Sequence, residues 1–142
     1  MRSLYEWDAD YITELGSQEE TATFEKKAAD GLTREKIAQG VCAFANSGEG
    51  FMVFGMKDEK GGGGLDAGVL ATKGRQPIKD WVEALIPKLH QPPIEGCEAR
   101  FIQNPMHHQP DRGVLVVAVP LSERRPHWPK DVEIPYLRVG AH

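Results

Sequence analysis

Three carboxylates are the first candidates for chemistry in this sequence. Glu20 and Glu25 lie five residues apart in the segment ETATFEKK, and Asp58 follows the apolar run FMVFGM. Clustered carboxylates hold Mg²⁺ or Mn²⁺, and such ions can clamp a phosphodiester while water attacks it. If the three side chains converge, they predict a divalent-metal-dependent nuclease with Glu20 and Glu25 as metal ligands.

The spacing of the two glutamates also allows a simpler interpretation. Residues five apart point to opposite faces of one continuous strand, so Glu20 and Glu25 meet only if the strand begins between them or bulges there. Lys57, next to Asp58, would either contact phosphate or neutralise the site. Otherwise the carboxylates are solvated charges or ion-pair partners, which are weak indicators of function.

Cationic side chains offer a second chemistry, the binding of nucleic-acid phosphates. Lys26 and Lys27 follow Glu25, Arg124 and Arg125 form a pair before a proline-rich segment, and Arg138 lies near the end of the sequence. Lysine and arginine position a nucleic-acid backbone without reading its sequence. We expect these five residues to contact phosphate; ordinary solubilising charge is the alternative for each of them.

Other residues with chemical potential favour structural roles. Asn46, followed by Ser47 and Gly48, is typical of a helix C-terminus, where asparagine and glycine tolerate a positive φ. The glycine run at 61–64 lacks the GxxxxGK[ST] pattern, so it does not predict a phosphate-binding loop of the ATPase type. Cys42 and Cys97 are far apart and show no CxxC spacing, which favours buried free thiols over a disulfide or a zinc site.

Short helices and strands must position these residues. Apolar spacings of three and four predict helices over 3–15, over 33–47 with Thr33 as N-cap, and over 76–90 with a break at Pro87. Alternating or continuous apolar runs predict strands over 20–28, 51–56, 98–103, 113–120 and 136–139. This order does not alternate strictly enough for a doubly wound parallel sheet. We therefore expect an α+β fold with a mixed, mainly antiparallel sheet and two to three helices packed on it.

Length and composition fit one domain, with an N-terminal helix in residues 1–18 and a core in residues 19–142. No apolar stretch reaches the length of a membrane helix, and the acidic start does not resemble a signal peptide, so we expect a cytoplasmic protein without membrane contacts. The net charge of −4 argues against wrapping duplex DNA by charge alone. Residues 1–30 carry −5 and the remainder +1, which still allows a local basic surface.

The succession of motifs resembles the Schlafen AlbA-like domain family over about residues 14–140. The matching positions are Glu20, Glu25 and Lys27, then Phe44-Ala45-Asn46, then the glycine-bounded strand Gly50 to Gly55, and finally Ser122, Pro126, Tyr136 and Arg138-Val139-Gly140. The sequence departs from the family pattern at three places. Lys26 replaces an aromatic residue, Glu49 replaces the first of two glycines, and Met56 and Lys57 stand where many members have acidic residues.

The resemblance implies a nucleic-acid-binding module, with DNA as the first expectation, such as a targeting domain of a transcriptional regulator. It places Lys27 and Arg138 in the basic face, gives Asn46, Gly50, Gly55 and Gly140 structural roles, and requires no cofactor. Some Schlafen relatives cut RNA with a carboxylate cluster, so a Mg²⁺- or Mn²⁺-dependent endoribonuclease is the alternative. A third hypothesis is a protein-interaction or dimerisation domain that lacks nucleic-acid affinity, which the acidic N-terminal segment would suit. A homodimer is compatible with all three.

Overall fold

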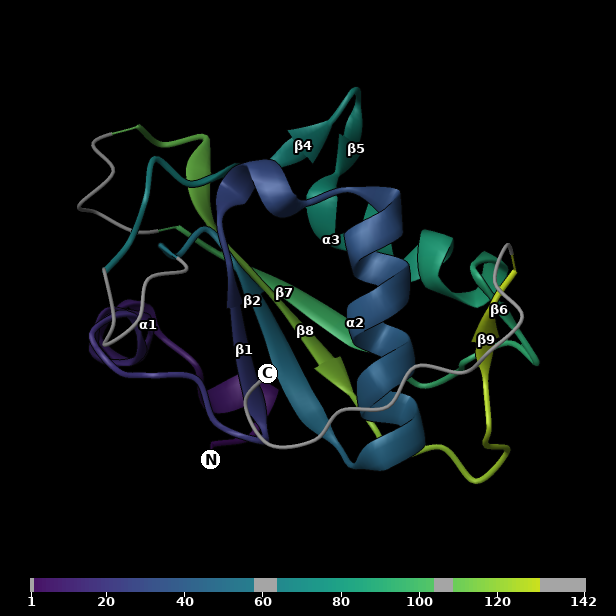
Figure 1. Ribbon diagram of the computed structural model, residues 1–142. Helices are drawn as coiled ribbons and strands as arrows, with labels where there is room; N and C mark the ends of the chain where they lie inside the picture. The colour runs from purple at the N-terminus through teal and green to yellow at the C-terminus, as the bar shows by residue number, and fades with distance from the viewer. Residues whose placement is uncertain (1, 58–63, 104–108, 131–142) are drawn as a thin grey trace.

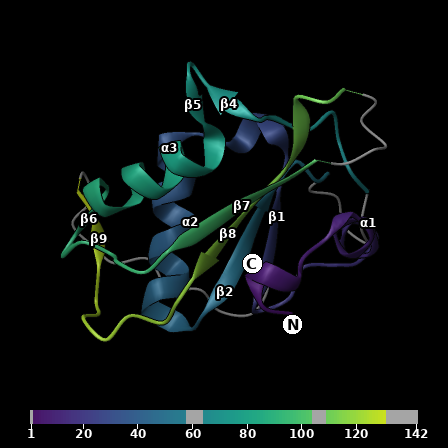
Figure 2. The same ribbon diagram turned by 180° about the vertical axis from the view of Figure 1, so that it is seen from behind.

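One mixed sheet runs through the middle of the molecule, and helices cover both of its faces (Figures 1 and 2). The computed structural model describes residues 2–57, 64–103 and 109–130. Strand β1 (Phe24–Lys27) pairs in parallel with β2 (Gly50–Phe54), and β8 (Arg112–Val119) pairs antiparallel with β2, β3 (Val69–Leu70) and β7 (Glu98–Gln103). Because β2 and β7 pair with the same residues of β8, they flank it on opposite sides. The prediction of an α+β fold with a mixed, mainly antiparallel sheet is confirmed.

Two short ribbons lie outside the sheet. Strand β4 (Thr72–Lys73) pairs with β5 (Gln76–Pro77) as a protruding hairpin, and β6 (His90–Gln91) pairs with β9 (Trp128–Pro129) beside the helices (Figure 1). Neither ribbon, nor β3, is expected from the sequence patterns, because two-residue strands are too short to show an alternation of apolar and polar residues.

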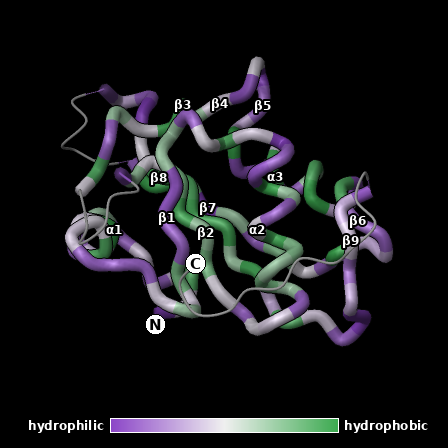
Figure 3. The backbone as a smooth tube through the Cα atoms, viewed as in Figure 1, coloured by the Kyte–Doolittle hydropathy of each residue, from purple (hydrophilic) through white to green (hydrophobic). Residues whose placement is uncertain are grey.

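The two faces of the sheet bury different sets of side chains. Helices α2 (Arg34–Ser47) and α3 (Ile78–Leu85) pack on the face that carries Met52, Phe54, Leu115, Val117 and Val119. The 3-10 helix η1 (Leu4–Glu6) and helix α1 (Ala9–Gly16) cover the opposite face, which carries Phe24, Val53, Val114 and Val116. Since β2 and β8 are buried on both faces, their sequences are continuously apolar, as Figure 3 shows for the centre of the molecule.

The predicted helix at the N-terminus is wrong in one respect, because the segment forms two short helices instead of one. Trp7 is extended between η1 and α1 and fully buried, and its indole N–H donates to the carbonyl oxygen of Arg2. Asp8 then starts α1 by accepting a hydrogen bond from the Tyr11 N–H at 2.8 Å. The predicted apolar positions Leu4, Ile12 and Leu15 are nevertheless buried.

The other predicted elements agree well with the structure. Thr33 is the N-cap of α2 and accepts a hydrogen bond from the Lys36 N–H, and α3 continues after Leu85 as the 3-10 helix η3 (Ile86–Lys88), which contains Pro87. The predicted strand at 20–28 is limited to β1, and the 3-10 helix η2 (Ala29–Gly31) follows it. The predicted strand at 136–139 lies outside the described residues.

Two predicted structural glycines have clear steric reasons. A Cβ on Gly50 would lie 2.1 Å from the Phe44 ring, so a glycine is needed where β2 passes α2. Gly55 ends β2 with φ at +111°, a conformation that glycine adopts without strain. Among the described residues, no helix is both long and apolar enough to cross a bilayer.

The register of the strands gives the sheet two ends. We call the end where β1 and β2 finish and β8 begins the hairpin end, since η2, β3 and the β4–β5 hairpin lie there (Figure 1). The opposite end, where β2 begins, β8 finishes and α2 terminates, is the clamp end.

Candidate functional site

The two predicted glutamates lie on either side of the start of β1. The strand begins at Phe24, so the first condition for their convergence is met. Glu20 Oε1 accepts a hydrogen bond from the Lys26 N–H at 3.0 Å, and Glu25 Oε1 lies 3.1 Å from Lys27 Nζ. Both carboxylates therefore have local bonding roles. Within the described ranges no group of three or more potential metal ligands occurs, and Asp58 lies outside those ranges.

Lys26 is not available for phosphate, and its prediction as a phosphate contact is wrong. The side chain is 1% exposed, and its Nζ donates to the carbonyl oxygen of Gln18 at 2.6 Å. Neighbouring residues of a strand point to opposite faces, so Lys27 points the other way and is half-buried. Lys26 lies two residues after the buried Phe24, so strand alternation places both side chains on one face, and this signal would have identified Lys26 as the buried lysine.

The remaining predicted cations do not gather on one surface. Lys27 pairs with Phe54 at the hairpin end, whereas Arg124 and Arg125 are exposed and follow the end of β8 at the clamp end. The four-residue span of β8 between Leu115 and Val119 alone separates them by roughly 13 Å. Arg138 and Gly140 lie outside the described residues.

The hairpin end gathers cations that the sequence patterns did not single out. Beside Lys27 lie five further cationic residues, all exposed except the half-buried Arg112: Arg34, Lys36, Lys73, Arg75 and Arg112. A Cβ on Gly31 of η2 would lie 3.7 Å from Lys27 Cβ and 3.8 Å from Lys36 Nζ, so these two lysines meet over η2. Lys73 and Arg75 flank Gly74 at the tip of the hairpin, where φ is +64°. A glycine between two cations was the one sequence signal for this tip.

Five carboxylates accompany these six cations: Glu25, which pairs with Lys27, and Asp30, Glu35, Asp66 and Asp111. Asp66 is half-buried, and its two oxygens accept hydrogen bonds from the N–H of Ala29 at 2.7 Å and of Gly68 at 2.8 Å. It therefore ties η2 to the start of β3. The excess of positive charge is small but local, in a chain whose net charge is −4.

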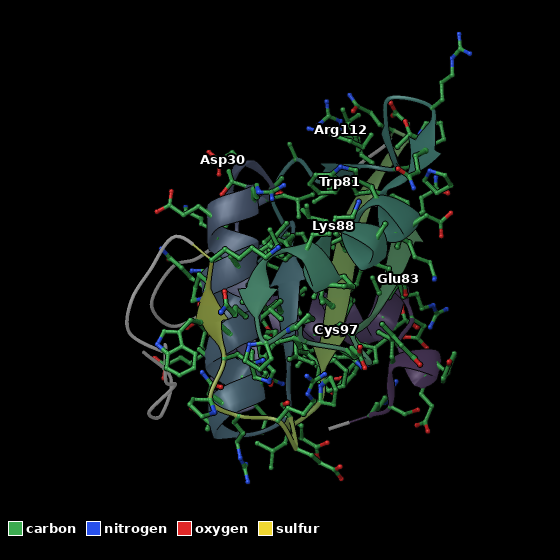
Figure 4. The ribbon with its side chains drawn as sticks, turned by 90° about the vertical axis from the view of Figure 1, so that its right-hand side faces the viewer. Asp30, Trp81, Glu83, Lys88, Cys97 and Arg112 are labelled. Atoms are coloured by element: carbon green, nitrogen blue, oxygen red, sulfur yellow. The ribbon has the colours of Figure 1, made fainter. Side chains whose placement is uncertain are left out.

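A cavity of about 510 Å³ opens at the hairpin end. It lies between η2 on one side and the segment from Asp66 to Lys73 on the other, with Ile78 and Arg112 completing its walls. Figure 4 shows Asp30 and Arg112 at this end of the molecule, with Trp81 below Arg112. The ammonium of Lys73 lies 5.3 Å from the centre of the Trp81 ring.

The clamp end uses its polar side chains internally. Asn46 donates from Nδ2 to the His127 carbonyl oxygen at 3.0 Å and accepts from the His127 N–H at 2.8 Å. The His127 ring in turn contacts the carbonyl oxygen of Pro92 and the hydroxyl of Ser122. Asn46 is not the predicted positive-φ C-cap, since it lies inside α2 and the C-cap Gly48 is extended with φ at 164°. Its amide binds the distant β9 segment to α2, which sequence spacing could not reveal.

Burial also limits the chemistry of three further side chains, one histidine and two cysteines. His90 is fully buried, and this burial lowers the pKa of its imidazole, although the Ala38 carbonyl oxygen 2.7 Å from its Nε2 acts in the opposite direction. Cys42 and Cys97 are free, as predicted, and Cys42 is fully buried while Cys97 is half-buried. Burial raises the pKa of the Cys97 thiol to about 12, which makes it a poor nucleophile at neutral pH.

Comparisons with known proteins agree with this fold. The sheet with helices on both faces places the chain among small α+β modules. More specifically, it belongs to the family Schlafen, AlbA_2, whose sequence model matches residues 20–142. The resemblance inferred from the motifs is thus confirmed. No curated protein matches the chain significantly.

One solved structure is similar over the whole chain. It is the solution NMR structure of the N-terminal domain of a Nitrosomonas europaea protein named as related to the ATP-dependent DNA helicase RecG. The two share 23% sequence identity with a TM-score of 0.60, and the alignment covers 100% of this chain and 92% of that one. At this identity the likeness shows a common fold.

Proposed function

We propose that the protein is a nucleic-acid-binding module that grips phosphates with the hairpin end, as a targeting or regulatory domain would. The observation that carries this proposal is the group of six cations at that end, mostly exposed and drawn from four separate segments. Membership in the Schlafen, AlbA_2 family and the likeness to a domain of a protein named for a DNA helicase support it.

The proposed contacts differ from those expected from the sequence. Lys27 keeps its place, whereas Arg124 and Arg125 lie at the opposite end and would at most meet a second stretch of the same ligand. Arg138 stays a proposal that rests on its motif position. Contacts of this kind bind DNA and RNA alike, because they engage the backbone and not the bases.

Fluorescence anisotropy with labelled single-stranded DNA, duplex DNA and structured RNA tests the proposal. Binding should weaken steeply between low and physiological salt, because each neutralised phosphate releases counterions. The triple variant Lys36→Gln, Lys73→Gln, Arg75→Gln should lose most of the affinity, and Arg124→Gln, Arg125→Gln is the matched control. A loss of affinity in the control variant alone would show that the interface lies at the clamp end. No binding to any ligand at low salt would overturn the proposal and favour a protein-interaction domain.

A metal-dependent nuclease is the second candidate, favoured by one observation. Strand β1 begins at Phe24, between Glu20 and Glu25. The two carboxylates are therefore not forced onto opposite faces of one continuous strand. Mn²⁺ or Mg²⁺ should then produce cleavage products on a gel that Glu25→Gln abolishes. Intact substrate in the presence of either ion would reject this candidate.

A further inference from the structure

We infer that the cavity at the hairpin end receives one unpaired nucleotide of a nucleic-acid strand, so that the protein prefers single-stranded over fully paired segments. This inference rests on the proposed function and adds a site to it. Four properties of the cavity carry it: size, apolar floor, cationic rim and fixed walls.

The size fits a small organic ligand. A volume of about 510 Å³ lies within the range of roughly 300 to 1,000 Å³ that is common for such pockets. The cavity is open to solvent through the exposed residues Asp30, Ala67 and Thr72, so a segment of a longer strand can enter it without displacing the fold.

The floor is apolar and largely buried. Val69 and Ile78 are 5% and 3% exposed, and the half-buried Leu32 completes the surface. A base is flat and its two faces are weakly polar, so covering one face with aliphatic side chains removes apolar surface from water. Phosphate alone, or an acidic peptide, would leave this floor exposed.

The rim carries the charges that a nucleotide phosphate requires. Lys73 and Arg112 both line the cavity, and each is held by a second contact. The Lys73 ammonium lies over the Trp81 ring, and Arg112 Nη1 donates to the Gly68 carbonyl oxygen at 3.3 Å. A guanidinium has five N–H donors in a planar fork, so one bond to the wall still allows a phosphate to be bound.

The walls are fixed before any ligand arrives. Asp66 accepts hydrogen bonds from the N–H of Ala29 in η2 and from the N–H of Gly68 in its own segment, so one charge-assisted hydrogen bond spans the two sides of the cavity and the other holds the Asp66 side chain in place. Asp30, exposed on the rim, is placed to accept a hydrogen bond from a base amino group or a ribose hydroxyl.

The strand preference follows from the cost of exposing a base. In a duplex the base is paired and stacked, and taking it out costs a few kcal/mol, whereas a single strand offers it at little cost. Phosphate contacts elsewhere at the hairpin end do not make this distinction. The cavity is therefore the feature that would separate single strands from duplexes.

The test compares a short labelled single strand with a blunt hairpin duplex of the same composition at low salt. The wild type should bind the single strand at least about tenfold more tightly than the duplex. Ala67→Leu, which narrows the cavity from an exposed position, should weaken single-strand binding about fivefold or more and leave duplex binding within about twofold. Ala84→Leu, on the exposed side of α3 and away from the cavity, is the matched control and should change neither.

A second measurement does not depend on a variant. Amide NMR shifts on adding the single strand should be largest at Gly68, Val69 and Leu70, and adenosine monophosphate at equal concentration should produce much smaller ones. Equal binding of strand and duplex together with an unaltered Ala67→Leu variant would overturn the inference and leave the proposed function standing. No binding of either oligonucleotide would reject both. If a mononucleotide binds as tightly as the strand, the claim that the cavity is occupied by a nucleotide of a longer strand is rejected.

Discussion

The two ends of the sheet treat polar side chains in opposite ways. At the clamp end, Asn46 and His127 are 8% and 0% exposed and bond to each other and to the surrounding backbone. At the hairpin end, Lys36, Lys73 and Arg75 are exposed to solvent. Polar groups that are buried and internally bonded hold the fold together, whereas exposed cations break few internal contacts when they turn toward a ligand. The comparison separates the residues of the fold from those of the proposed interface.

The largest effect should come from closing the space between β2 and α2 at the clamp end. Gly50→Ala would place a Cβ 2.1 Å from the Phe44 ring, and we expect a loss of about 3 kcal/mol in the free energy of unfolding, or a failure to fold. Urea denaturation measures it. Gly48→Ala is the control, since no atom lies within 4 Å of the added Cβ. Equal stability of the two variants would contradict the close approach.

Removing the Asn46 side chain should be nearly as costly. Asn46→Ala leaves the buried N–H and carbonyl groups of His127 without these two hydrogen bonds, so we expect about 2 to 3 kcal/mol of destabilisation in thermal or urea unfolding. Gln39→Ala on the same helix removes only an exposed bond to Glu35 and should change stability by less than about 0.5 kcal/mol. Nucleic-acid binding below the unfolding transition should be the same in both variants. A weaker affinity in Asn46→Ala would mean that the clamp belongs to the interface.

The two neighbouring lysines of β1 should have different roles, Lys26 in stabilising the fold and Lys27 in binding phosphate. Lys26→Ala removes a buried stem and its bond to Gln18, and should lower stability by about 1 to 3 kcal/mol without changing the salt dependence of binding. Lys27→Ala should leave stability within about 0.5 kcal/mol and weaken binding. The reverse result would return Lys26 to the set of phosphate contacts.

Acidification should act on the buried His90. Its pKa in the folded protein is lowered from the ordinary 6.5 because burial disfavours the charged ring, and nearby His127 adds to this. The unfolded chain therefore binds the proton more readily, so stability is complete above pH 6.5 and falls as the pH drops from there toward the lowered folded pKa. His90→Gln should reduce this dependence, measured as unfolding midpoints at pH 7.5 and 5.5. Identical slopes in both proteins would assign the acid sensitivity to other groups.

The smallest effect on stability belongs to the tip of the hairpin. Arg75→Gln should change the free energy of unfolding by less than about 0.5 kcal/mol, because the side chain is exposed. The same change should lower affinity and reduce the slope of log K against log salt by about one phosphate contact. An unchanged salt slope would remove Arg75 from the interface.

The sequence predicted those parts of the fold in which one physical signal acts alone. Thr33 caps α2 because its hydroxyl accepts from the Lys36 N–H in the first turn of the helix, a local contact, and β2 and β8 are continuous apolar runs because both faces are covered. Where the outcome depends on distant partners, the patterns were insufficient. The carbonyl oxygen of Gln18 satisfies the buried amine of Lys26, and Asn46 bonds to a segment 81 residues away.

The candidate site was harder to predict for the same reason. Lys73 and Arg112 are far apart in sequence, and the antiparallel pairing of β3 with β8 brings their segments to one cavity. Lys73 has only the weak signal of a glycine between two cations, and Arg112 belongs to none of the motifs identified in the sequence. Several expected site residues followed the family pattern instead, and Arg138 and Gly140 of that pattern lie outside the described residues, as does the candidate metal ligand Asp58.

The pairing of β8 has a consequence for how the chain reaches its native state. This strand, at residues 112–119, forms ladders with partners at 50–54, 69–70 and 98–103, so among the described strands of this sheet only β1 and β2 can pair before it joins. Contacts over such sequence separations are slow to form because the loop entropy is lost first. Until then β2 presents an unpaired apolar edge, a template for intermolecular pairing. On a ribosome, therefore, the period before residue 119 emerges is when this protein is most exposed to aggregation.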